Sequence, residues 1–173
     1  MKTLIAIITF GFAGLPLLAQ SAGQQAEAFY QQGLAAEKAG KPDEALAAYR
    51  DALGLFPQHA NARYRAGQVK INASSIKAGA TEAKIGAVVI PAYQIEDATV
   101  SEAIELLSIA MDKATEGKTT PNFIIEDPKQ KLADTRISMQ LKNIPVKAVL
   151  EYIHSQANTK ARYDEHAVVI LAR

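Results

Sequence analysis

The second half of the chain repeats one pattern of apolar and polar positions, first from Ile95 and again 46 residues later from Leu141. Each copy reads as an alternating strand, a polar turn, an amphipathic helix and a β-branched strand. The closing strands are expected at 122–125 and 168–171. Two such units in tandem predict an α+β domain of βαββαβ order, in which both helices pack on small sheets.

The helix of the first copy is predicted over 100–116, with Thr99 and Glu102 as a capping box and a glycine just beyond its end. The helix of the second copy starts after Pro145, because proline is tolerated in the first turn, and ends near 157–158. Apolar residues at helical spacing predict the buried face of each helix. They are Val100, Ala103, Ile104, Leu107 and Met111 in the first copy, and Val146, Val149, Leu150 and Ile153 in the second.

Two further strand signals flank these copies. The apolar run 85–91 predicts a short strand that stops at its proline. It could extend the sheet as an edge strand or link the two halves of the chain as an extended arm, and we expect the edge. The pair Asp164–Glu165 predicts the turn of a hairpin between 161–163 and 167–170.

The phrases that begin at Ile95 and Leu141, each a strand, a turn and a helix, resemble the secretin and TonB short N-terminal domain, also called the secretin N0 domain. We place the corresponding domain at residues 85–173. The resemblance implies a periplasmic, signal-proximal module of outer-membrane secretins or TonB-dependent receptors that acts by contacting other proteins. It implies no catalytic residue.

Residues 26–59 form a 34-residue period that resembles a tetratricopeptide repeat, a pair of antiparallel helices. The matching positions are Phe29, Gly33, Ala36, Ala45, Tyr49, Ala52 and Pro57. A second repeat opens at 60–67, but its spacing fails after Lys70, and 74–81 reads as a helix end and a linker. The sequence therefore predicts a helical region at 26–80 with one full repeat and one partial repeat.

One and a half repeats cannot cover their own apolar side, because about three are needed for independent stability. The C-terminal domain, a second copy of the chain or a partner must cover it. The apolar positions that we expect to be left partly open are Phe29, Leu34, Leu46, Leu53 and Leu55. The candidate protein-binding residues are Phe29, Gln32, Arg63 and Tyr64.

Residues 1–22 predict a cleaved secretory signal, because an apolar run follows Lys2 and small residues follow the run. The run is shorter than the roughly 20 residues of a membrane-spanning helix, and a retained anchor is the alternative. The chain has no cysteine, which excludes disulfides, thiolate metal sites and a lipid anchor on an N-terminal cysteine. We expect an exported bacterial protein, periplasmic or associated with the outer membrane.

The sequence contains no recognisable catalytic motif. His59, His154 and His166 each lack a second histidine or cysteine at ligand spacing, and no phosphate or dinucleotide loop occurs. The net charge of +1 indicates no nucleic-acid partner. The segment between Asp51 and Glu82 has basic residues and no acidic ones, and a solvated basic face is favoured over a site for an anionic partner. We expect no metal, no cofactor and no enzymatic activity.

Two functions remain open. The first is a non-enzymatic cell-envelope interaction module, associated with a secretin-type secretion or pilus system or a TonB-type system. Its C-terminal domain docks on a protein partner, and the repeat offers a second contact surface. The alternative is a periplasmic peptide-binding scaffold or assembly chaperone that acts through the tetratricopeptide groove. In either case the partners are proteins, and a homo-oligomer is one possibility.

Overall fold

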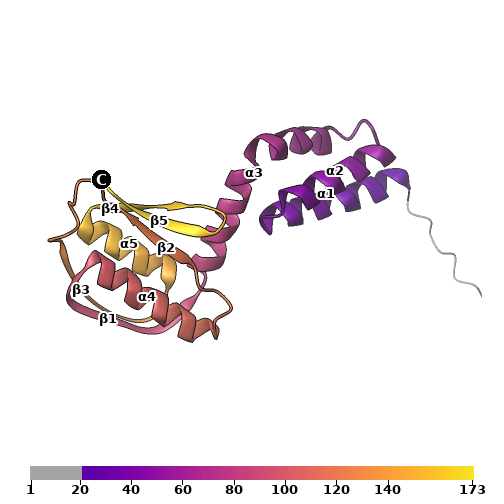
Figure 1. The fold of residues 1–173 in the computed structure, drawn as a ribbon. Coiled ribbons are helices and arrows are strands. Elements are labelled where there is room, and N and C mark those ends of the chain that lie inside the picture. Colours follow the sequence, from indigo (N-terminus) through magenta and orange to yellow (C-terminus); the bar gives the residue numbers. More distant parts are fainter. Residues whose placement is uncertain (1–20) are drawn as a thin grey trace, which may run out of the picture.

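The computed structural model describes residues 21–173, which form two lobes joined by one long helix (Figure 1). The helical lobe contains α1 (Ala22–Lys38), α2 (Pro42–Leu55) and the first half of α3 (Ala60–Gly86). The α+β lobe contains β1 (Val89–Thr99), α4 (Val100–Thr115), β2 (Asn122–Glu126), β3 (Arg136–Pro145), α5 (Val146–Ala157), β4 (Thr159–Tyr163) and β5 (Ala167–Ala172). The predicted signal, residues 1–22, lies outside the described residues except for its last two positions.

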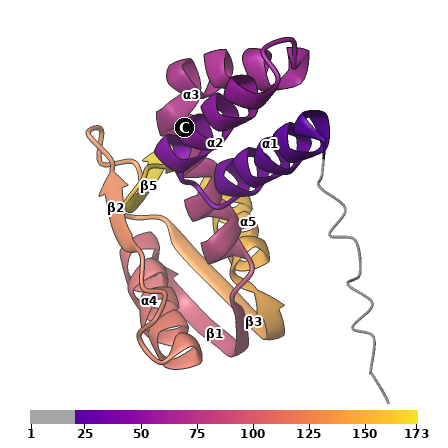
Figure 2. The same cartoon turned by 90° about the vertical axis from the view of Figure 1, so that its right-hand side faces the viewer.

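The helical lobe is a close-packed hairpin of α1 and α2 with α3 beside it (Figure 2). Gly33 of α1 lies against the ring of Tyr49 on α2, where an added Cβ would come within 2.3 Å of a ring carbon. Gly40 makes the turn between the two helices with φ of 74°. The small residues therefore let the helices approach, as the repeat pattern predicts. Around them the lobe buries mostly alanines: Ala26, Ala45, Ala52 and Ala62.

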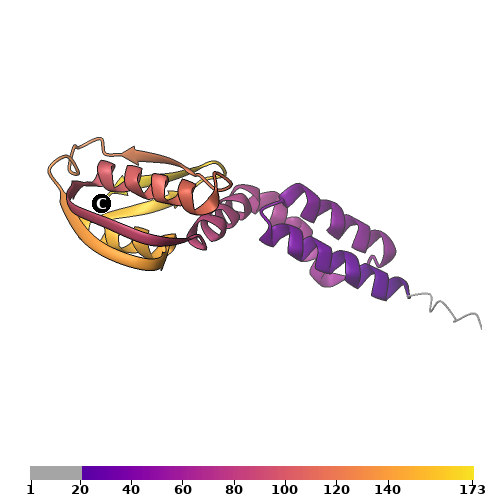
Figure 3. The same cartoon turned by 90° about the horizontal axis from the view of Figure 1, so that it is seen from below.

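Helix α3 does not end where the sequence suggested. The predicted linker at 74–81 is wrong, because the helix continues to Gly86 with a kink at Asn72 (φ −107°, ψ 18°). Ile76 packs against the core of the helical lobe, and Ile85 is buried in the core of the α+β lobe. This packing outweighs the weak helix propensity of Ser74, Ser75 and Gly79. One helix therefore belongs to both lobes, as Figure 3 shows from below.

The predicted strand at 85–91 is also corrected. Its first residues end α3, and β1 begins at Val89 and continues through Pro91 to Thr99. β1 pairs with β3 alone among the described strands. A strand with one partner has backbone N–H groups on its free side, and a proline there breaks no sheet hydrogen bond. Residues 89–91 therefore lie at the edge of a sheet, as expected, and do not form a linking arm, but the strand continues past the proline instead of stopping there.

The two sequence copies also match in space. β1 pairs antiparallel with β3, and β2, which follows α4, pairs parallel with β5. Asp97 and Asn143, at equivalent positions two residues before each helix cap, both adopt the left-handed conformation, with φ of 49° and 48°.

The predicted hairpin of β4 and β5 is confirmed, and it adds a strand to the expected order, which becomes βαββαββ. The mixed α+β class with small sheets is confirmed.

Both predicted helix faces of the α+β lobe are buried. Every apolar position predicted for α4 and α5 lies in one core, which also takes Ile90 from β1, Ile137 from β3 and Ile170 from β5. The capping box of Thr99 and Glu102 forms as predicted. The C-cap residues of the two helices, Glu116 and Asn158, both adopt the left-handed conformation. The helix pattern was therefore sufficient to predict both the ends and the buried sides of these elements.

Candidate protein-interaction surface

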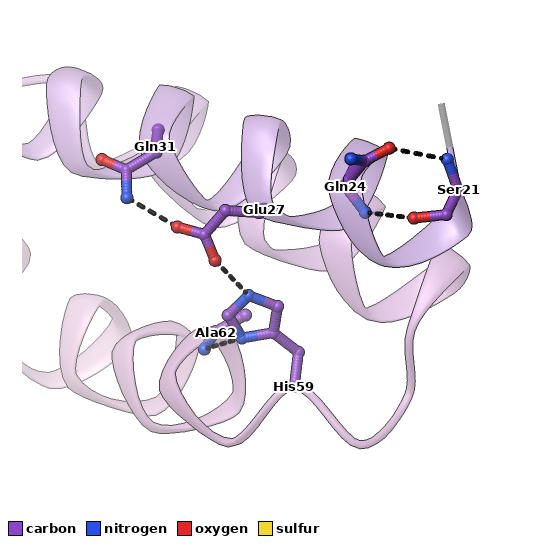
Figure 4. A network of polar contacts seen from close by, with 6 residues as sticks. All are labelled: Ser21, Gln24, Glu27, Gln31, His59 and Ala62. Carbon is purple, nitrogen blue, oxygen red and sulfur yellow. Dashed lines mark hydrogen bonds and ion pairs between the residues drawn. The ribbon is translucent and has the colours of Figure 1, made fainter. Parts of the chain in front are cut away.

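The end of the first repeat is tied to its beginning by His59, the residue that caps α3 (Figure 4). The backbone N–H of Ala62 donates to Nδ1 of His59 at 3.2 Å, and Nε2 lies 3.3 Å from a carboxylate oxygen of Glu27 on α1. Since Nδ1 accepts a hydrogen bond, the neutral ring carries its proton on Nε2, and this N–H donates a hydrogen bond to Glu27. Hydrogen bonds from Gln31 and His59 hold the pKa of Glu27 below its usual value.

A second polar tie joins all three helices through the carboxylate of Glu37 on α1. The hydroxyl of Tyr49 on α2 donates to one oxygen of Glu37, and Arg65 on α3 lies 3.4 Å from the other. Burial, together with this hydrogen bond to a carboxylate, raises the pKa of Tyr49, which keeps its proton. These contacts and the His59 tie fix α3 against α1 along one side.

Among residues 21–173, no helix packs against the opposite side of α3. We call the exposed residues Arg63, Tyr64, Gly67, Lys70 and Ile71 the α3 outer face. The side chains of Tyr64 and Ile71 are 65% and 77% exposed, and they lie seven residues apart, two turns along the helix. The guanidinium of Arg63 donates to the carbonyl of Pro57 at 2.5 Å.

The four candidate binding residues do not form one groove. Phe29 is half-buried and packs in the core of the helical lobe. Gln32 is exposed on α1. Its side chain leaves the helix roughly 140° around the axis from Glu27 and from Glu37, the residues that contact α3. Arg63 and Tyr64 lie together on the α3 outer face. The geometry therefore separates the half-buried Phe29, an exposed position on α1 and a pair on α3.

The repeat pattern did not point to Ile71, because its spacing fails after Lys70. The spacing of seven residues from Tyr64 was the available signal, since it puts two large apolar side chains on one face of a continuous helix. Of the apolar positions expected to stay open, Phe29, Leu34, Leu46 and Leu53 are half-buried against the lobe's own core, and Leu55 is exposed.

Comparison with protein families supports the identity of this lobe. The family model of the tetratricopeptide repeat matches residues 26–69, which cover α1, α2 and the first part of α3. Residues 26–69 thus contain a tetratricopeptide-type repeat, a kind of unit that generally mediates contacts between proteins. Comparison with curated proteins and comparison with solved structures both return no match.

Residues 21–173 contain no group of three or more histidine, cysteine, aspartate or glutamate side chains placed to hold a metal ion. In the same range, no helix combines the length and apolar character needed to cross a bilayer. The α3 outer face is the candidate interaction surface, because Tyr64 and Ile71 expose large apolar side chains there.

Proposed function

We propose that this protein is a non-enzymatic interaction scaffold that docks a partner protein on the α3 outer face. The exposure of Tyr64 and Ile71 carries the proposal. In a repeat array each repeat covers the open face of its neighbour. Here α3 opens a second repeat, and the helix that would complete that repeat does not follow it, because the chain continues along α3 into the other lobe. A partner can take the position that the missing helix leaves.

The cell-envelope setting of this proposal rests on two sequence features. They are the signal-like residues 1–22 and the resemblance of residues 85–173 to the secretin and TonB short N-terminal domain. Under this proposal the protein is exported and works beside a secretin-type or TonB-type outer-membrane system. The α+β lobe then supplies a second contact surface at the other end of α3.

The alternative is a peptide-binding scaffold or assembly chaperone that uses the first repeat itself. Gln32 favours it, since its side chain is exposed on α1 within the matched repeat. The two proposals differ in where the partner lies: along α3 in the first and along α1 in the second. A position-specific experiment can therefore separate them.

The test is photo-crosslinking in cells that express the full chain. A photoreactive phenylalanine analogue replaces Tyr64 in one variant, Gln32 in a second and the exposed Arg50 of α2 in a matched control. We expect the variant at position 64 to form a defined adduct, identified by mass spectrometry, that the control does not form. Adding Ile71→Ala to the variant with the photoreactive residue at position 64 should strongly reduce the yield of this adduct. Loss of a central apolar contact costs about 2 kcal/mol of binding free energy, or roughly 30-fold in Kd.

The crosslinking result decides between the proposals. Adducts from position 32 and none from position 64 would favour the peptide-binding alternative. Adducts from neither position, with the protein folded and abundant, would reject both.

A further inference from the structure

A groove runs between β1 and the outer side of α4. Residues 94–98 of β1 form one wall, and Leu106 and Ile109 of α4, which are 45% and 57% exposed, form the apolar part of the other. We call this the α4 groove. Four of the residues that line it are acidic: Glu96, Asp97, Glu102 and Glu105.

Most of this negative charge is not neutralised by an ion pair among residues 21–173. Glu102 is used in the cap of α4, where it accepts hydrogen bonds from Thr99. Among the ion pairs formed by residues 21–173, none involves Glu96, Asp97 or Glu105. A segment that covers Leu106 and Ile109 and carries positive charge beside its own apolar residues would complement this surface.

The α3 outer face has that chemistry. Residues 52–81 contain four basic residues and no acidic ones. Arg65 and Lys77 are paired within the chain, with Glu37 and Glu165. Arg63 bonds only a backbone carbonyl and Lys70 forms no ion pair among the described residues, so their charges remain available beside Tyr64 and Ile71.

The two surfaces also match in form. On α3 the charged and apolar residues extend from Arg63 to Ile71, and on α4 they extend from Glu102 to Ile109. Each stripe covers about two helical turns, roughly 10 Å. Two helices can therefore lie side by side with apolar residues in contact and opposite charges at the rim. The surfaces belong to different lobes (Figure 1).

We propose that the partner of the α3 outer face is a second copy of this chain, which receives that face in its α4 groove. This inference rests on the proposed docking role of the α3 outer face and names its partner. Because the two surfaces are different, the contact is head-to-tail, and successive copies form a ring or a filament. In this contact the acidic side chains of the α4 groove in one copy face the unpaired cations Arg63 and Lys70 of the next copy.

The first test measures the mass of the full chain, purified from expressing cells, by analytical ultracentrifugation across a concentration series. We expect the mass to rise above one chain with concentration, and the association to weaken at high salt, where charges are screened. Lys70→Glu or Glu105→Lys alone should weaken it by about tenfold or more, and both swaps in one chain should restore it. Arg50→Glu and Glu151→Lys, matched swaps of exposed charges outside both surfaces, should leave it unchanged.

A second measurement uses the absence of cysteine from the chain. Mixed chains that carry Ile71→Cys or Ile109→Cys should form a disulfide between the two variants under mild oxidation. Ile71→Cys mixed with Tyr152→Cys is the control, because Tyr152 is exposed on α5 outside the groove. This readout does not depend on the stability of a charge-swapped variant.

A chain that remains monomeric at every concentration in low salt would overturn self-association. So would assembly that ignores both single swaps, or a 71–109 disulfide no more frequent than the control. If the chain is monomeric but position 64 crosslinks a different protein, only this inference fails and the scaffold proposal stands. If it is monomeric and position 64 crosslinks nothing, both fail.

Discussion

The two lobes are stabilised in different ways. Of the largest fully buried side chains in the described residues, the helical lobe contributes Tyr49 and Val69, and the others belong to the α+β lobe. The helical lobe otherwise buries alanines and relies on close helix contact and polar ties through Glu27 and Glu37. Since buried apolar area is the main stabilising term, the α+β lobe should be the more stable region. The helical lobe has less core and more surface open for partners.

The largest expected effect is in the α+β core. Leu107 is fully buried on α4, and its replacement by alanine should cost about 2 to 5 kcal/mol of unfolding free energy, measured by urea denaturation. Leu106→Ala on the same helix is the matched control and should cost less than about 0.5 kcal/mol, the usual size for surface changes. Equal losses at the two positions would mean that α4 packs with a different face.

A smaller effect is expected in the helical lobe, where the same substitution should have opposite signs at two glycines. Gly33→Ala places a methyl group against the buried ring of Tyr49, and overpacking costs about 1 to 3 kcal/mol. Gly67→Ala meets nothing within 4 Å and should stabilise α3 by up to about 1 kcal/mol, the gain in helix propensity.

Far-UV circular dichroism during urea unfolding measures both glycine variants. Hydrogen exchange shows whether protection changes in α1 and α2, the helices that Gly33 brings together. Stabilisation by Gly33→Ala would show that the α1–α2 contact is looser than the structure has it.

The smallest effect concerns pH and His154 of α5. Its Nδ1 lies 2.8 Å from the hydroxyl of Thr159, while Nε2 is buried with no partner among the described residues. Burial lowers the pKa of His154, with a further contribution from the cation of Arg173, against the opposing charge of Glu151. The folded protein then binds fewer protons than the unfolded chain, so stability should fall as pH drops below about 6.5.

His154→Gln should reduce this loss of stability at acidic pH. His166→Gln is the control, because His166 lies exposed beside the β4–β5 turn. Urea midpoints across an acidic pH series measure both variants. Identical pH profiles for the two would rule out His154 as the source.

The sequence determined the parts of this protein that depend on residues close together in the chain. The α4 and α5 stripes, the Thr99 cap, the β4–β5 hairpin and the close approach at Gly33 follow from helical period, capping chemistry and side-chain size. Each of these signals lies within a short segment of the chain, so the sequence alone is enough to predict the element.

Contacts between distant residues decided the rest. α3 continues past Lys70 because Ile76 and Ile85 meet the cores of two different lobes, and Pro91 sits inside β1 because that strand has a single partner. Phe29, predicted as a binding residue, is half-buried because α2 and α3 pack around α1. The exposure of Tyr64 and Ile71 depends on which helix covers α3, and only the tertiary structure specifies that packing.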